Sequence, residues 1–386
     1  MAKPKSESKP APKPKAEPKA EPKAEPKVES KAEAKPGVKS ELTSLGRYKI
    51  NGVLGKGAMG LVYDGMDPTL DRRVAIKTIR MASLDEATAK HYAMRFKREV
   101  RAVAKVNHAN IVQVYDFGSE GELNYIVMEY IQGKELKDAF DSKQRFDLQA
   151  IFRIMGELLE ALSFAHQAGV IHRDVKPANV MIDTKGHVKL ADFGVARVND
   201  PDAEGEKTRV GAVIGTPAYM SPEQSQGQPI DHRTDLFSAG VLFYQLLTGQ
   251  KPFDGTGYAL AKKIIQDDPV WPSTILEVPP TFDRVVARAL AKEPDQRYQT
   301  ARKFAEDLKR LAAGKEPEAP AMALPQPPAA AAAPASASLA GTEAEKEFWN
   351  EVKDSKDPGD VKLYLEQFPD GTFADLARKK LGELGA

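Results

Sequence analysis

A glycine-rich segment limits the folds that this chain can adopt. The stretch Gly55-Lys56-Gly57-Ala58-Met59-Gly60 matches G-x-G-x-x-G, a spacing that lets backbone amides approach phosphate oxygens without interference from Cβ atoms. A dinucleotide-binding fold would need a helix directly after this loop. The chain continues instead with two strand-like runs, Leu61-Val62-Tyr63-Asp64-Gly65 and Arg73-Val74-Ala75-Ile76-Lys77. A strand, loop and strand followed by a strand that ends in lysine predict a flap over a nucleoside triphosphate.

The amino-acid composition excludes several classes of protein. The 386 residues include no cysteine, which excludes a disulfide scaffold, a zinc–cysteine site, an iron–sulfur cluster and thiol catalysis. The 56 Lys and Arg nearly balance the 55 Asp and Glu, so we expect no specific nucleic-acid partner. Prolines interrupt the apolar stretch 319–340, and we expect neither an export signal nor a membrane span. A cytoplasmic protein is the expectation.

The strands around the glycine loop, and the helical run after them, resemble the N-terminal part of the protein kinases. Lys77 ends a Val-Ala-Ile-Lys strand, whose lysine contacts the α- and β-phosphates of ATP in that family. Glu99 lies in the helical run 92–106, where the family places the glutamate that pairs with this lysine. A solvated helix face is the alternative for Glu99, but apolar residues on the adjacent face favour the pairing. The residues that match the phosphate-covering loop are Gly55, Gly57, Gly60 and Val62.

A second motif resembles the catalytic loop of the same family, with every position filled. It runs His172-Arg173-Asp174-Val175-Lys176-Pro177-Ala178-Asn179, and Asp192-Phe193-Gly194 follows after a strand-like segment. By this resemblance Asp174 accepts the proton of the substrate hydroxyl, and Lys176 neutralises charge on the transferred phosphoryl group. The resemblance also implies that Asn179 and Asp192 bind Mg²⁺. The order and intervals of these motifs are typical of the bacterial eukaryotic-like (Hanks-type) serine/threonine protein kinases.

The resemblance implies an adenine pocket at the junction between two lobes. Apolar residues would sandwich the base, hinge backbone would bind its edge, and an acidic residue after the hinge would reach the ribose. For the apolar members, a core role and a pocket role coincide, because the pocket is cut into the core. The pocket residues that we expect are Val62, Ala75, Met128, Glu129, Ile131, Glu135 and Met181.

Other residues match structural positions of the family. Asp235 begins a run to Tyr244 that is apolar on nearly all sides and predicts a central helix. Its carboxylate resembles the one that anchors the catalytic loop, and Glu223 and Arg297 resemble a buried ion pair of the lower lobe. The residues to which we assign structural roles are His172, Arg173, Phe193, Thr216, Glu223, Asp235 and Arg297.

The fold that these motifs imply is α+β, with two lobes. We expect a small N-lobe built of an antiparallel sheet with helix C, a larger and mostly helical C-lobe, and a small C-terminal helical module. Residues 1–44 repeat Ala-Glu-Pro-Lys and bury little, so a disordered and mildly basic tail is expected there. The expected boundaries are 1–44 for the tail, 45–312 for the kinase domain (N-lobe 48–128, hinge 129–135, C-lobe 136–312), 313–342 for a Pro/Ala-rich linker and 343–386 for the module.

The function implied is transfer of the ATP γ-phosphate, with Mg²⁺, to serine or threonine hydroxyls of protein substrates. Lysine two residues after the catalytic aspartate, and Thr216, resemble serine/threonine rather than tyrosine kinases. A small-molecule phosphotransferase is one alternative, and the full segment 192–223 argues against it. A catalytically silent scaffold that regulates partners is the other alternative. A silent scaffold is expected to lack at least one catalytic or metal-binding residue. All four are present in this sequence: Lys77, Asp174, Asn179 and Asp192.

The arginine beside the catalytic aspartate suggests control by phosphorylation. Arg173 marks the subclass in which a phosphorylated activation loop supplies a partner for this positive charge. Thr208 is the candidate phosphosite, with an ordinary exposed loop threonine as the alternative. Autophosphorylation would bring two copies together as a dimer.

The last 44 residues resemble a short helical module of tetratricopeptide character. Val361, Tyr364, Leu365 and Phe368 recur at helical spacing, and a second run repeats nearly the same interval. The members of the second run are Phe373, Leu376, Ala377 and Leu381. Two roles of this module fit the sequence equally well: binding of a protein partner and a purely structural cap.

Overall fold

The computed structural model describes most of the patterned region and parts of the C-terminal module. Candidate phosphosite Thr208 and Thr216 lie outside the described residues. The described residues are 42–57, 60–80, 86–121, 123–193, 217–318, 349–350, 352–353, 361–362, 364–365, 368 and 371–383.

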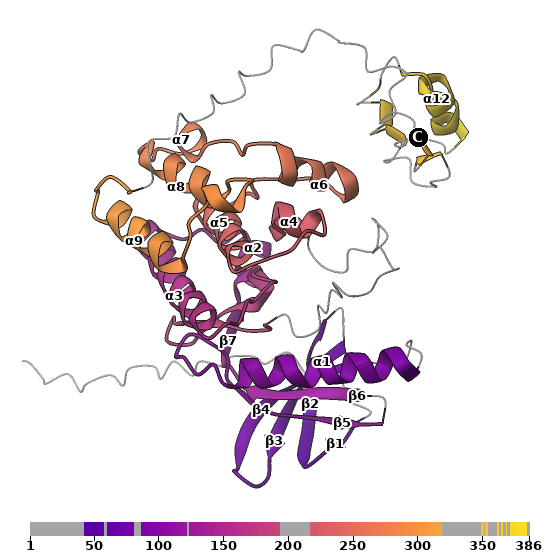
Figure 1. Ribbon diagram of the computed structural model, residues 1–386, viewed down its shortest axis with the longest axis vertical. Coiled ribbons are helices and arrows are strands. Elements are labelled where there is room, and N and C mark those ends of the chain that lie inside the picture. Colours follow the sequence, from indigo (N-terminus) through magenta and orange to yellow (C-terminus); the bar gives the residue numbers. More distant parts are fainter. Residues whose placement is uncertain are drawn as a thin grey trace, which may run out of the picture.

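The first lobe is an antiparallel sheet of six strands in the order β1-β2-β3-β4-β6-β5, with helix α1 against it (Figure 1). The strands are β1 (Ser44–Leu45), β2 (Tyr48–Gly57), β3 (Gly60–Asp67), β4 (Arg72–Arg80), β5 (Val114–Glu120) and β6 (Leu123–Glu129), and the helix is α1 (Glu86–Ala104). Side chains alternate across a strand. In β4, Val74 and Ile76 therefore join one apolar cluster, while Ala75 and Ile79 join another.

Helix α1 supplies the apolar surface that covers the second of these clusters. Phe96, Val100 and Val103 are spaced at i, i+4 and i+7, so they share one face of the helix. All three are buried in the cluster that contains Ala75 and Ile79. The spacing therefore places Glu99, the neighbour of Val100, near the lysine strand.

The second lobe is mostly helical and is built around α5. The helix α5 (Arg233–Thr248) is buried at every residue from Thr234 to Thr248, as its apolar pattern predicts, and it packs against α3 and α8. The other helices are α2 (Leu136–Asp141), α3 (Leu148–Gln167), α4 (Pro222–Ser225), α6 (Gly257–Gln266), α7 (Pro272–Ile275), α8 (Thr281–Ala289) and α9 (Ala301–Ala312).

A small three-stranded sheet, ordered β7-β8-β9, lies where the lobes meet. Its strands are β7 (Gly133–Glu135), β8 (Val180–Asp183) and β9 (Val188–Leu190). The carbonyl of Leu190 accepts from Val112 N at 2.9 Å, which joins β9 to the segment that leads into β5. The catalytic-loop motif precedes β8 and the Asp192 motif follows β9, so this sheet brings the two motifs to one edge.

The C-terminal module contains helix α12 (Ala374–Glu383) and its own apolar cluster. Val361, Tyr364 and Phe368 are buried in it, and the rings of Trp349 and Phe373 stack with centroids 5.5 Å apart. Leu376 does not belong to this cluster, because its side chain is 54% exposed. Of the two neighbouring residues in the helical run, Ala377 is turned inward and Leu376 outward.

Candidate active site

The catalytic loop is anchored on one buried carboxylate. Asp235, in the first turn of α5, is fully buried. Its Oδ2 accepts from His172 N at 2.8 Å, and its Oδ1 accepts from Arg173 N at 2.7 Å. The Nε2 of His166, at the end of α3, also lies 2.8 Å from Oδ2. This carboxylate therefore ties α3, α5 and the catalytic loop together.

His172 is a packed residue rather than a proton donor. Its Nε2 lies 2.9 Å from the carbonyl of Ala191, and its ring lies 4.6 Å from the ring of Phe193. Complete burial lowers the pKa of His172 against the opposing effect of Asp235, so the ring stays neutral near pH 7. Both His172 and Phe193 thus position the aspartates beside them.

Asp174, Lys176 and Asn179 form one polar cluster. The Nζ of Lys176 lies 2.8 Å from Oδ2 of Asp174. The 3-10 turn Pro177–Asn179 brings the amide of Asn179 back to donate to the carbonyl of Asp174 at 2.8 Å and to its Oδ2 at 3.1 Å. A carboxylate, an ammonium and an amide are thus held together as the spacing of the motif implies.

Two residues of the site have left-handed backbone conformations. Arg173 has φ 64° and Asp192 has φ 57°, values that are uncommon for residues other than glycine. Such conformations cost about 1–3 kcal/mol each and occur mainly where surrounding contacts enforce them. Here the Arg173 amide donates to Asp235, and its carbonyl accepts from Gln224.

Lys77 pairs with Asp192 in this structure, and Glu99 pairs with Arg173. The Nζ of Lys77 lies 2.7 Å from Oδ2 of Asp192, and Nη1 of Arg173 lies 3.7 Å from Oε1 of Glu99. The expected pair of Lys77 with Glu99 is thus replaced by two others among the same four groups. The attraction between an ammonium and a carboxylate increases as the distance between them falls. The left-handed turn at Asp192 brings its carboxylate to the ammonium of Lys77.

Asn179 and Asp192 offer oxygen ligands at one edge of the site. The backbone of Asn179 accepts from Ala191 N at 2.8 Å, which places Asn179 beside the strand end that carries Asp192. The amide nitrogen of Asn179 faces Asp174, so its oxygen is directed elsewhere. Carboxylate and amide oxygens are the ligands that Mg²⁺ prefers, so these two residues fit such an ion.

Apolar residues from three strands line the region where the lobes meet. Ala75 lies opposite Met128 in the sheet register, and Val62 lies opposite Lys77. Val62, Ala75, Met128 and Ile131 belong to one apolar cluster. Met181 of β8 is partly buried and lies outside that cluster, opposite Glu135 of β7.

Two acidic residues of the hinge region have different surroundings. The side chain of Glu129 accepts from Lys189 Nζ at 2.8 and 2.9 Å, which fixes the start of the hinge to β9. Desolvation by the surrounding protein, with a smaller contribution from Asp138, raises the pKa of Glu135. Glu129 therefore has a structural partner in Lys189.

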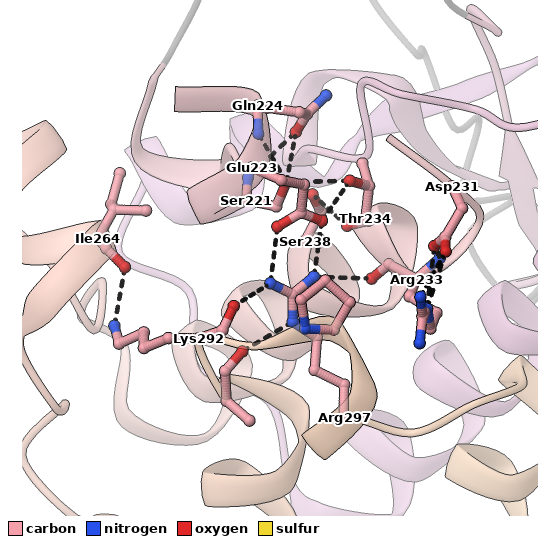
Figure 2. A network of polar contacts seen from close by, with 12 residues as sticks. Ser221, Glu223, Gln224, Asp231, Arg233, Thr234, Ser238, Ile264, Lys292 and Arg297 are labelled. Carbon is pink, nitrogen blue, oxygen red and sulfur yellow. Dashed lines mark hydrogen bonds and ion pairs between the residues drawn. The ribbon is translucent and has the colours of Figure 1, made fainter. Parts of the chain in front are cut away.

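The ion pair of Glu223 and Arg297 is the centre of a buried network (Figure 2). Two hydrogen bonds of 2.7 Å join the guanidinium to the carboxylate, and Arg297 is 1% exposed. Burial alone would raise the pKa of Glu223, but the hydrogen bonds from Arg297 and Thr234 lower it. The carbonyls of Ala291 and Lys292 accept from Arg297 at 2.7 Å, and the carbonyl of Arg233 accepts at 3.4 Å.

This network also reaches the catalytic loop through a residue that the motifs do not mark. Ser221 caps α4, and its capping partner Gln224 donates from Nε2 to the carbonyl of Arg173 at 2.9 Å. No motif in the sequence indicates the roles of three residues, Gln224, Thr234 and His166. The capping-box spacing from Ser221 to Gln224 signals a helix start there, but it does not signal the contact with Arg173.

Comparison with known proteins identifies the family. The family model described as "Protein kinase domain" matches residues 48–308. The chain belongs to the protein kinase family. The two-lobed kinase fold expected from the motifs is confirmed.

The relatives are serine/threonine kinases of bacteria. "Serine/threonine-protein kinase PknB" of Mycolicibacterium smegmatis is 43% identical over 280 residues, covering 71% of this chain and 44% of the relative. A "probable serine/threonine-protein kinase" of Streptomyces coelicolor is 41% identical over 276 residues, or 70% of this chain and 40% of the relative. Another from Clostridium acetobutylicum is 38% identical over 264 residues, or 68% and 39%. This kinase chain thus matches less than half the length of these relatives.

None of the helices in the described ranges has the length and apolar character needed to cross a bilayer.

Proposed function

We propose that this chain is a serine/threonine protein kinase that transfers the γ-phosphate of ATP to hydroxyls of protein substrates. One observation carries the proposal. The carboxylate of Asp174 lies within 3.1 Å of both Lys176 and Asn179, on a loop that the buried Asp235 anchors. A carboxylate and an ammonium held side by side suit a hydroxyl nucleophile and an anionic group transferred to it. The names of the bacterial relatives support the same activity.

The chain's own residues divide the work of this reaction. Asp174 would accept the proton of the substrate hydroxyl, and Lys176 would balance the negative charge that builds on the phosphoryl oxygens. Lys77 would bind the α- and β-phosphates, and Glu99 would orient it once Lys77 leaves Asp192 and Glu99 leaves Arg173. Asn179 and Asp192 would hold Mg²⁺, which neutralises phosphate charge when bound. Gly55, Gly57 and Gly60 would cover the phosphates, and the pocket residues from Val62 to Met181 would hold adenosine.

A labelled-phosphate assay tests this function. The full chain is incubated with γ-labelled ATP, with and without Mg²⁺, alone and with a generic basic protein. We expect Mg²⁺-dependent transfer, abolished by chelation, and label only on phosphoserine and phosphothreonine after acid hydrolysis. An identical preparation of the Asp174→Asn variant controls for contaminating kinases. Equal labelling by both preparations, or none by either, would favour the silent scaffold.

A pair of glycine variants separates phosphate binding from folding. A Cβ on Gly60 would lie 1.9 Å from the carbonyl oxygen of Thr78, whereas a Cβ on Gly55 would meet nothing within 4 Å. We expect Gly60→Ala to lower the free energy of unfolding by about 1–3 kcal/mol, because the clash is with backbone. Gly55→Ala should leave stability unchanged and raise the KM for ATP roughly tenfold, a loss of about 1.4 kcal/mol. Urea unfolding and ATP titration measure the two effects, and equal destabilisation by both variants would contradict this assignment.

We also propose that phosphorylation of Thr208 activates the kinase by giving Arg173 an anionic partner in addition to Glu99. Within the described residues, Nε of Arg173 is buried and has no hydrogen-bond acceptor. A phosphate could take this donor, and one charge-assisted hydrogen bond contributes about 1.5–3 kcal/mol. Autophosphorylation between two copies would make a transient dimer the route to activation.

Thr208→Ala tests this regulation. We expect kcat/KM to fall at least roughly tenfold, as the loss of one such hydrogen bond implies. Mass spectrometry of the loop peptide should show its phosphate missing. Thr184→Ala, at an exposed turn threonine, is the matched control and should change neither quantity. Unchanged activity with unchanged loop phosphate in Thr208→Ala would remove Thr208 from the mechanism.

The helical module remains the proposed site for a protein partner. Its described surface includes the exposed Leu376 on α12, with Arg378 and Lys379 also exposed. Deleting residues 315–386 should remove partners from a pull-down, and an unchanged set of partners would count against the proposal.

A further inference from the structure

A groove of about 400 Å³ lies between α3 and α9, on elements that do not carry the active-site residues. The two helices run side by side in the C-lobe (Figure 1). Leu159, Phe164 and Ala305 line it with apolar surface, and Ser163 and Gln167 add polar groups. Phe164 is 39% exposed, and its ring lies 5.1 Å from the ring of His108, which also lines the groove. The groove thus combines an exposed phenylalanine beside a half-buried histidine with hydrogen-bonding side chains.

The chain that leaves α9 turns back and is held along the same helix. Pro317 is buried, and Glu318 N donates to Oδ1 of Asp307 at 2.7 Å. The Glu318 carboxylate also pairs with Lys303 at 3.4 Å and with Arg310. Lys303 is the sequence neighbour of Arg302, which lines the groove. The linker therefore starts from a fixed point beside the groove.

The linker opens with a segment whose chemistry suits an aromatic-lined groove. Leu324-Pro325-Gln326-Pro327-Pro328 places two prolines three residues apart, which is one turn of a polyproline II helix. Pro325 and Pro328 would therefore share a face, as in the segments that bind between aromatic side chains. Five residues lie between Glu318 and Leu324, and the six residue steps reach roughly 19 Å at about 3.1 Å per residue. That reach is similar to the length of α9 at about 1.5 Å per residue.

Charge favours this segment over the other proline-rich part of the chain. Residues 319–342 carry no charged side chain, whereas the N-terminal repeats are rich in lysine. Two basic side chains, Arg302 and Lys309, and two acidic ones, Glu160 and Glu306, line the groove, so its formal charges balance. A lysine-rich segment would lose hydration of its charges on entering this groove without meeting a net opposite charge, whereas an uncharged segment avoids that cost.

We propose that the segment Leu324–Pro328 docks into the groove between α3 and α9 of its own chain. Tethering at Glu318 gives the segment a millimolar effective concentration, so a weak polyproline contact is enough to keep it bound. Docking would fix the path of the linker that carries the C-terminal module. The inference is independent of the proposed catalytic activity.

The absence of cysteine makes a direct test possible in the full chain. Ser163→Cys with Leu324→Cys introduces one pair, and Ser163→Cys with Leu339→Cys is the matched control farther along the same linker. If chain length alone mattered, the first pair would form its disulfide about sixfold faster than the control pair under mild oxidation, by the −3/2 power law. If the segment docks in the groove, we expect the ratio of the two rates to exceed about twentyfold. The readout is the rate of intramolecular disulfide formation by intact mass and non-reducing gel.

Further variants of the first pair decide which contact is responsible. Adding Pro325→Gly and Pro328→Gly, or adding Phe164→Ala, should reduce the rate to that expected from chain length. An unchanged rate in these variants would overturn the proposal. Disulfide-linked dimers in place of the intramolecular bond would assign the groove to a second copy, and competition by a peptide of residues 1–40 would assign it to the N-terminal tail. Either result would also overturn it.

Discussion

Asp174→Asn is expected to lower kcat by about 10²–10⁴-fold, the range for loss of a general base. The KM for ATP should change little, because Asp174 acts on the substrate hydroxyl and Lys77 contacts the nucleotide. The fold should be retained, since the amide oxygen of Asn can still accept from Lys176, whose Nζ lies 2.8 Å from the native carboxylate. Steady-state kinetics with a phosphorylatable protein and thermal unfolding of the same preparation measure both effects.

Asp295→Asn is the matched control for this loss of a carboxylate. Its side chain is 91% exposed, so the kcat of this variant should equal that of the unmodified chain. A kcat for Asp174→Asn within the error of that control would show that another group takes the proton. Loss of stability in Asp174→Asn alone would show that the cluster with Asn179 is structural.

Arg297→Leu is expected to lower the free energy of unfolding by about 3–5 kcal/mol, because it leaves the buried Glu223 carboxylate without its partner. The cost includes the carbonyls of Ala291 and Lys292, which lose their donor. Urea unfolding followed by circular dichroism measures it. Arg302→Leu is the matched control, since its side chain is 80% exposed, and should change stability by less than about 0.5 kcal/mol.

The double variant Glu223→Leu with Arg297→Leu separates the unpaired charge from the other losses. Removing both charges should recover part of the stability, because no carboxylate is then buried alone. The recovery should be incomplete, since Thr234 donates to Glu223 at 2.6 Å and loses that acceptor. A double variant no more stable than Arg297→Leu would show that the carbonyl contacts, and not the ion pair, dominate.

The fold could be predicted because the motifs resemble those of a known family, and the grouping of Asp174, Lys176 and Asn179 because these residues are close in sequence. The spacing from Asp174 to Asn179 spans one short turn, so residues in the motif must meet in space. The run after Asp235 is apolar on all sides, which only a central helix can bury. Such features do not depend on how distant elements are placed.

The ion pairing of the site could not be predicted in the same way. Whether Lys77 meets Glu99 or Asp192 depends on the orientation of α1 and on the left-handed turn at Asp192. No spacing in the sequence encodes which of these two carboxylates lies nearer to the ammonium of Lys77. The same holds for Gln224, whose contact with Arg173 joins positions 51 residues apart. The helical period also leaves the buried residue of α12 undecided, because both Leu376 and Ala377 fit it. Packing in the folded module buries Ala377 and leaves Leu376 exposed.

The anchoring of the catalytic loop on Asp235 has a consequence for the timescale of its motion. The amides of His172 and Arg173 donate to a carboxylate with no exposed surface, inside the central helix of the lobe. Their hydrogens can exchange with solvent only when α5 itself opens, so they should exchange as slowly as the most protected amides of that helix. The loop that carries the chemistry would then be among the last parts of the lower lobe to unfold, and conformational control would lie with the side chains of Lys77, Glu99 and Arg173 above it.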